Sequence, residues 1–172
     1  MSAPPLDFSS LPLREPFFNR FKRALLLMTL GLLTSVLYID HTAINLALPH
    51  ITYHLKTTLT TSQWIMSAYD LAWALVVIPA GFYADAASKR LLCLFGMTIF
   101  AVASLVAGMS QSPWVLIGAR ILQGIGTGLY FPTLYGIIRL YFHHTHHSRA
   151  IGSLCLWSGL GMAVGPFLGG FS

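Results

Sequence analysis

The chain has 172 residues, of which 55% are hydrophobic and only 9% charged, and its mean hydropathy is +0.69. A soluble domain carries about 25% charged residues because its surface faces water, so this composition excludes a soluble globular protein. The net charge of +5 would suit a nucleic-acid partner. The basic residues, however, gather in short stretches between apolar segments, which argues against nucleic acid and for a lipid bilayer.

In chain order, residues 1–19 contain Pro and Ser without clear periodicity and predict a flexible cytoplasmic tail. Residues 20–172 predict a bundle of transmembrane helices. Their apolar material falls into segments of about twenty residues, the length that crosses a ~30 Å hydrocarbon core as helix. The segments do not alternate apolar and polar residues as membrane strands do. The sequence therefore predicts an all-α membrane protein with transmembrane helices at about 24–49, 64–84, 91–110, 113–135 and 150–172.

Basic residues alternate between the two ends of these segments. They precede the first segment, join the second to the third, and join the fourth to the fifth, whereas the other connections hold Lys56 alone or no basic residue. Cytoplasmic loops are enriched in Lys and Arg, so this pattern predicts a cytoplasmic N-terminus. The residues are Arg14, Arg20, Lys22, Arg23, Lys89, Arg90, Arg139 and Arg149.

Three charged residues interrupt the apolar segments: Asp40, Asp70 and Arg120. A charge within the bilayer is costly and usually faces a polar cavity on an ion or substrate path, so these residues indicate a transporter. Asp40 is the first candidate for a proton carrier or for recognition of a cationic substrate. The alternative is a carboxylate that only ties the first helix. Asp70 either adds negative charge to the cavity or lies shallow enough to be solvated.

Arg120, Gln123 and Thr127 share one face of the fourth segment, at positions i, i+3 and i+7. A cavity-lining stripe is the functional interpretation, and an interhelical hydrogen-bond seam is the structural one. Arg120 cannot be neutralised in a protein, which favours the first. Asn45 is expected to tie the first helix to a neighbour.

Two glycine-containing stretches complete the candidate set. At the junction of the second and third segments, Gly81 is expected to permit a close helix contact, Asp85 to pair with basic residues, and Lys89 and Arg90 to anchor the loop. In the fifth segment Gly161, Gly165 and Gly169 form a packing ridge, and Pro166 should bend the helix because it lacks a backbone donor.

These stretches resemble, in the expected order, motifs of the major facilitator superfamily, and in particular of its fourteen-helix drug:proton antiporters. The resemblance covers about Asp40 to Gly170. The matching residues are Asp40-His-Thr-Ala-Ile-Asn45-Leu-Ala-Leu-Pro49, then Trp64, Tyr69 and Pro79, then Gly81 to Arg90, Arg120-Ile-Leu-Gln123-Gly124, and Gly161 to Gly170. In the loop motif Tyr83, Ala86 and Ser88 stand where the family usually has Leu, Arg and Gly.

The resemblance implies part of the N-terminal half of that fold, in an incomplete form, and a protein that is not an enzyme and needs no cofactor. It implies proton-coupled efflux of amphipathic or cationic small molecules by alternating access in a bacterial inner membrane. Arg120 becomes a candidate for proton coupling, the Gly81–Arg90 loop a conformational switch, and the Gly161–Gly170 stretch a hinge. The partners are substrate, protons, lipid and the remaining helices. Two alternatives stay open: a truncated fragment inactive alone, and a small membrane scaffold or assembly protein.

Residues His143 to His147 contain four imidazoles and form the one apparent metal cluster. Imidazoles suit divalent transition metals. The cluster contains no Cys or acidic residue, so a polar, pH-responsive cytoplasmic loop is preferred and no metal site is predicted.

Overall fold

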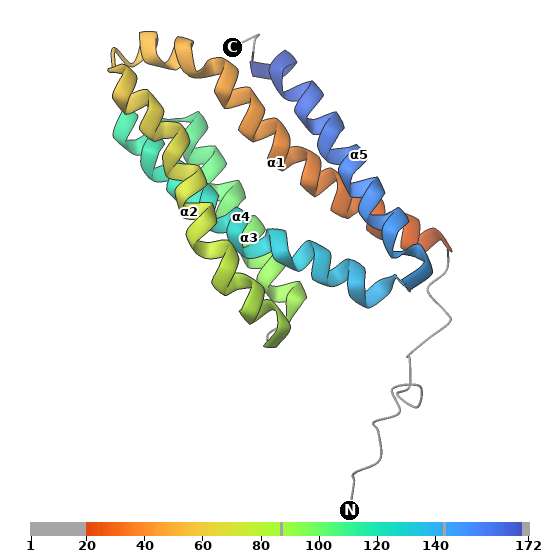
Figure 1. The fold of residues 1–172 in the computed structure, drawn as a ribbon. Coiled ribbons are helices and arrows are strands. Elements are labelled where there is room, and N and C mark those ends of the chain that lie inside the picture. The colour runs from red at the N-terminus through yellow and green to blue at the C-terminus, as the bar shows by residue number, and fades with distance from the viewer. Residues whose placement is uncertain (1–19, 87, 143, 170–172) are drawn as a thin grey trace, which may run out of the picture.

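The computed structural model describes residues 20–86, 88–142 and 144–169. All secondary-structure elements among these residues are helices, which confirms the predicted all-α class (Figure 1). Several helices are longer than the predicted apolar segments, because polar residues at their ends also adopt helical backbone conformation. They are α1 (Arg20–His54), α2 (Leu59–Ala86), α3 (Lys89–Gly108), α4 (Pro113–Tyr141) and α5 (His144–Gly169).

Four of the helices are long and apolar enough to cross a membrane, over Ala24–His54, Leu59–Tyr83, Lys89–Gly108 and Ser148–Phe167. Helix α4 is not among them, although it was predicted to span. It carries the polar residues Arg120 and Gln123 in its first half, and it packs between α2 and α3. Large apolar side chains are exposed on all five helices, as expected for surfaces in contact with acyl chains.

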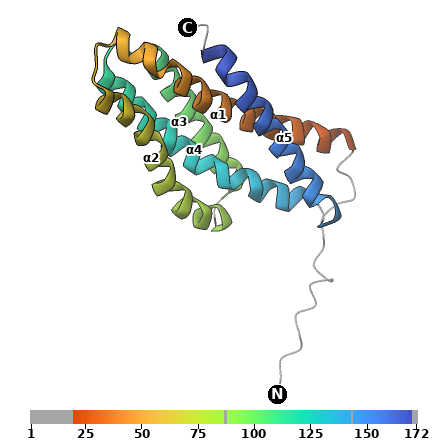
Figure 2. The ribbon, with the colours of Figure 1, turned by 45° about the horizontal axis from the view of Figure 1, so that its top comes forward.

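The helices form two groups. Helix α1 packs along α5, while α4 packs between α2 and α3. Figure 1 shows the separation of the two groups, and Figure 2 shows α5 again beside α1. Contacts between the groups are sparse by comparison. The buried apolar core lies mainly around the later half of α4; its largest fully buried apolar members include Leu134 and Ile138.

Small residues allow the close approaches within each group. A Cβ atom added to Gly126 would lie 2.6 Å from the carbonyl oxygen of Gly96, so α3 and α4 meet there backbone to backbone. Between α1 and α5, a Cβ added to Gly161 would lie 2.5 Å from the carbonyl oxygen of Ser35. The hydroxyl of Ser35 also donates to the carbonyl of Trp157 at 2.7 Å. These contacts fix the helices that hold the polar residues described next.

Candidate functional site

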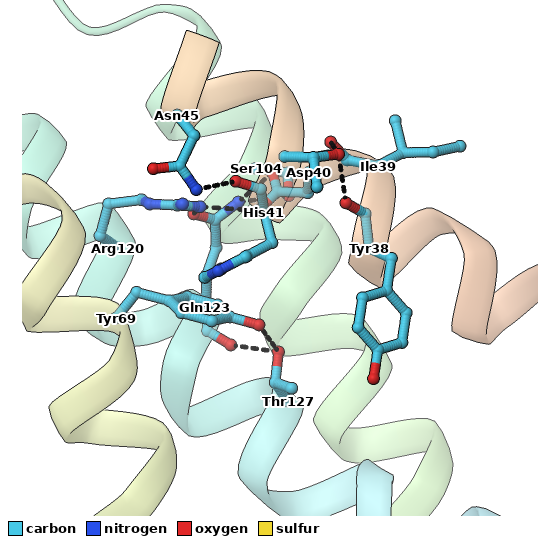
Figure 3. A network of polar contacts seen from close by, with 11 residues as sticks. Tyr38, Ile39, Asp40, His41, Asn45, Tyr69, Ser104, Arg120, Gln123 and Thr127 are labelled. Carbon is cyan, nitrogen blue, oxygen red and sulfur yellow. Dashed lines mark hydrogen bonds and ion pairs between the residues drawn. The ribbon is translucent and has the colours of Figure 1, made fainter. Parts of the chain in front are cut away.

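A polar cluster joins the two helix groups. Arg120 on α4 donates from Nη1 to Oδ2 of Asp40 on α1 at 2.6 Å, and to Oε1 of Gln123 at 2.9 Å. Gln123 donates in turn from Nε2 to Oδ1 of Asp40 at 3.1 Å and to the hydroxyl of Ser104 on α3 at 2.8 Å. Both carboxylate oxygens of Asp40 are therefore engaged by α4, as Figure 3 shows.

The guanidinium of Arg120 is fully buried, with 0% side-chain exposure. Its Nε and Nη2 have no hydrogen-bond partner within the described chain. The ring of Tyr69 on α2 lies 4.8 Å from its central carbon and stabilises the charge by a cation–π contact. The Tyr69 hydroxyl donates to Thr127 at 3.1 Å, and Thr127 donates to the carbonyl of Gln123 at 2.9 Å. The face of Arg120, Gln123 and Thr127 is thus fully buried between helices.

Asp40 is the charged member of the cluster that reaches open space, with 23% of its side chain exposed. It lines a cavity of about 610 Å³, the Asp40 cavity, between α1 and α3. The polar residues around this cavity are Asp40, Ser104, His50, His54 and Ser110. The ion pair is thus buried on the Arg120 side and open on the Asp40 side, and its guanidinium stays charged in either case.

Asp70 lies apart from this cluster. Its side chain is exposed and lines a separate cavity of about 130 Å³, the Asp70 cavity, between α1, α2 and α4. The indole Nε1 of Trp73, which also lines it, is buried and has no acceptor within the described residues. The remaining lining residues are mostly aromatic: Leu37, Tyr38, His41, Tyr69, Thr127 and Phe131. A carboxylate among aromatic faces is a suitable environment for an organic cation.

Asn45 does not tie α1 to a neighbouring helix as expected. It is exposed, and its Nδ2 donates to the carbonyl of His41 on the same helix at 3.2 Å (Figure 3). His41 lies against Tyr69 with ring centres 5.6 Å apart and lines the Asp70 cavity. The one-residue shift from Asp40 turns His41 about 100° around the helix, so the two neighbours face different cavities.

Sequence reasoning missed Ser104 and gave Tyr69 no role of its own. Ser104 is the α3 residue that accepts from Gln123, and Tyr69 is the aromatic partner of Arg120. The signal for Ser104 was weak, because small hydroxyl residues also occur in membrane helices without interhelical bonds. For Tyr69 the available signal was its place in the sequence directly before Asp70, a charged residue within an apolar segment.

The junction of α2 and α3 is only partly described. The side chain of Asp85 lies outside the described residues, so its expected pairing is not described. A Cβ added to Gly81 would meet nothing within 4 Å, so the close helix contact expected there is absent from the described chain. Lys89 and Arg90 line a cavity of about 860 Å³ between α1 and α3, together with Lys22 and Ser88.

In α5, Gly161 and Gly165 are buried against α1, at Ser35 and Thr42. Pro166 lies inside α5, which continues to Gly169; the surroundings of Gly169 lie outside the description. Residues His144 to His147, predicted as part of a pH-responsive loop, instead form the first turn of α5; His143 and the side chains of these four residues lie outside the description. Among the described residues, no group of three or more His, Cys, Asp or Glu side chains could hold a metal ion.

Comparison with known proteins gives a family match over residues 30–172, to the Major Facilitator Superfamily. An uncharacterized MFS-type transporter of Mycobacterium tuberculosis is 36% identical over 136 residues, covering 78% of this chain and 23% of that protein. The multidrug efflux pump LfrA of Mycolicibacterium smegmatis is 32% identical over 84% of this chain and 29% of its own length. The methyl viologen resistance protein SmvA of Salmonella typhimurium is 32% identical over 87% of this chain and 30% of its own length.

The chain therefore spans between 23% and 31% of the length of such relatives. The match begins within α1 and includes the whole of the polar cluster. Its apolar helices and the family match make it a multi-pass integral membrane protein. The chain belongs to the Major Facilitator Superfamily of membrane transporters.

Proposed function

We propose that this chain is the N-terminal part of a proton-coupled transporter that exports amphipathic or cationic small molecules by alternating access. The observation that carries the proposal is the ion pair between Asp40, which is open to a cavity, and Arg120, which is fully buried. The names of relatives, a multidrug efflux pump and a methyl viologen resistance protein, support export of drugs and organic cations.

Protonation of Asp40 is the proposed coupling step. A proton on this carboxylate removes the charge that Arg120 pairs with and weakens one of the few links between the α1–α5 and α2–α3–α4 groups. A buried guanidinium without a counter-charge is costly in free energy. Protonation of Asp40 therefore favours a rearrangement of the helices that gives Arg120 another partner or access to water. Deprotonation restores the pair. The two protonation states thus stabilise different arrangements of the helices, as a population shift requires.

The Asp70 cavity is the proposed substrate contact. Its carboxylate attracts a cation, and the aromatic faces of Tyr69 and Trp73 stabilise it further. A volume of about 130 Å³ is smaller than the ~300–1,000 Å³ of a drug-sized site, so the remaining helices of the transporter would complete it. Substrate sites of such transporters lie between helix repeats near the bilayer midplane, where this cavity would meet those helices.

The remaining assignments rest on the family resemblance and on charge. Gly81, Asp85, Lys89 and Arg90 would form a conformational-switch loop, and the glycine- and proline-containing part of α5 a hinge. Basic residues in the first turn of α1 and in the first turn of α3 favour a cytoplasmic N-terminus. Bacterial relatives favour the bacterial inner membrane.

The test is a vesicle assay on the full-length transporter in which a pH gradient drives uptake of a fluorescent organic cation. Asp40→Asn should abolish gradient-driven transport, and Asp40→Glu should restore part of it because the carboxylate returns. Thr98→Val is the matched control: Thr98 is exposed on α3 and donates to Leu94 of the same helix. Unchanged gradient-driven transport in a folded Asp40→Asn variant would remove Asp40 from the coupling step.

The fragment and scaffold alternatives make different predictions in the same assay. The 172-residue chain alone, reconstituted at equal density, should give no transport if it needs the remaining helices. A scaffold would give none in the full-length protein either. Transport by the full-length protein that depends on Asp40 therefore distinguishes the proposed function from a scaffold role.

A further inference from the structure

The end of α1 that leads to α2 carries two histidines one helical turn apart. The ring centres of His50 and His54 are 4.5 Å apart, with an angle of 49° between the ring planes. Both side chains are exposed. His54 also lies edge-on to Tyr53, with ring centres 6.4 Å apart. Neither histidine belongs to the polar cluster or to the Asp70 cavity, so the proposed transport step leaves this pair without a role.

The separation of the rings fits two imidazoles that bind one ion. When each coordinating nitrogen lies about 2 Å from the metal and the two bonds are at a right angle, the ring centres are about 4.5 Å apart. Residues at i and i+4 lie on the same face of a helix and supply this arrangement without any change of the backbone. The helix therefore preorganises a bidentate ligand.

The local electrostatics also favour a cation. Helix α1 ends at His54, so both imidazoles lie in its last turns, beside the negative end of the helix dipole. Pro49 directly precedes the pair and lacks the backbone N–H that would bond one turn back. An ion bound by both His50 and His54 would stabilise the helical turn that follows the hydrogen bond missing at Pro49.

Space for further ligands lies beside the pair. Both histidines line the Asp40 cavity of about 610 Å³, whose wall at the end of α3 includes Ser110. Water molecules in this cavity can complete the coordination of an ion that holds only two protein ligands.

We propose that His50 and His54 chelate a divalent transition-metal ion at the α1–α2 end of the molecule, with Cu²⁺ bound more tightly than Ni²⁺ or Zn²⁺. Neutral imidazoles are suitable ligands for all three ions, and a site with two nitrogen ligands and open water positions follows the usual affinity order, in which Cu²⁺ ranks highest. The ion is a ligand separate from the transported substrate.

The test uses the whole 172-residue chain in detergent, in a background where His143, His144, His146 and His147 are changed to Gln, so that the imidazoles of that cluster do not contribute to binding. Titration with Cu²⁺ should give one ion per chain, with an electron paramagnetic resonance spectrum of two nitrogen ligands. His50→Gln or His54→Gln should weaken binding at least tenfold, since each leaves a single imidazole.

His41→Gln is the matched control, because it removes a histidine from the same helix but outside the pair; its Cu²⁺ affinity should equal that of the background. Circular dichroism verifies that each variant is folded. As a second measurement, Cu²⁺ should raise the thermal midpoint of the background and leave that of His50→Gln unchanged. Equal Cu²⁺ affinity in the background and in both pair variants would overturn the proposal. So would one ion per two chains, which would indicate a bridge between molecules.

Discussion

Arg120 Nη1 lies 2.6 Å from Asp40 Oδ2, although the two residues are 80 positions apart in the sequence and belong to different helix groups. The pair is asymmetric: Arg120 is fully buried, whereas Asp40 keeps 23% of its side chain exposed. Solvent therefore reaches one partner and not the other. This asymmetry leads to the first prediction.

Asp40→Asn should destabilise the chain more than Arg120→Met. The first change leaves a buried guanidinium that cannot lose its charge, at a cost of about 3 kcal/mol, whereas the second leaves a carboxylate that can take up a proton. The double variant should recover part of the loss. The measurement is equilibrium unfolding in detergent, arranged as a double-mutant cycle; additive losses would show that the pair contributes no coupling energy.

Tyr69 is expected to contribute through both its hydroxyl and its ring. Tyr69→Phe removes the hydrogen bond to Thr127 and should cost about 1 kcal/mol. Tyr69→Leu also removes the aromatic face beside Arg120 and should cost more, because the cation–π contact is buried. Unfolding free energies of the two variants measure the difference. Equal losses would mean that the ring contributes nothing beyond its bulk.

Gly126→Ala should loosen the contact of α3 with α4. Its added methyl group would lie 2.6 Å from the Gly96 carbonyl oxygen, so the backbones must separate, at a cost of about 1–3 kcal/mol. Gly152→Ala is the matched control: a Cβ there meets nothing within 4 Å, and Ala favours the helix. Thermal midpoints should fall for Gly126→Ala and stay level or rise for Gly152→Ala. A level midpoint for both would contradict the close packing.

Asp70→Asn should weaken recognition of cations in the full-length transporter without removing proton coupling. Loss of the carboxylate should raise the KM for a monovalent organic cation about five- to tenfold, equivalent to about 1 kcal/mol, while transport of a neutral substrate stays unchanged. Transport kinetics with the two substrates measure this. A similar change for both substrates would assign Asp70 to structure rather than to charge recognition.

The helical class could be predicted from the sequence because composition and segment length depend on the bilayer and not on tertiary contacts. The pattern at Arg120, Gln123 and Thr127 also sufficed to place them on one face, since helical periodicity is local. The segment of α4 could be predicted in the same way, because its overall hydrophobicity matches that of α2 and α3; its burial between those two helices could not.

Which side chains contact each other in the site depends on how far each helix is shifted and rotated against its neighbours. The local sequence pattern of one helix does not determine this. Asp70 and Asp40 interrupt similar apolar stretches, yet they line different cavities. Asn45 has an amide side chain that suits a hydrogen bond between helices, but it donates to the carbonyl of His41 within α1. Ser104 became a partner of Gln123 through the close approach of α3 to α4, which depends on Gly96 and Gly126 together.

The most direct measurement of the coupling step is proton release on substrate binding. The full-length transporter is placed in weakly buffered detergent solution with a pH-sensitive dye, and an organic cation is added. If Asp40 exchanges a proton against substrate, the unmodified protein releases protons and a folded Asp40→Asn variant that still binds the cation releases none. Equal proton release from both proteins would contradict the role of Asp40.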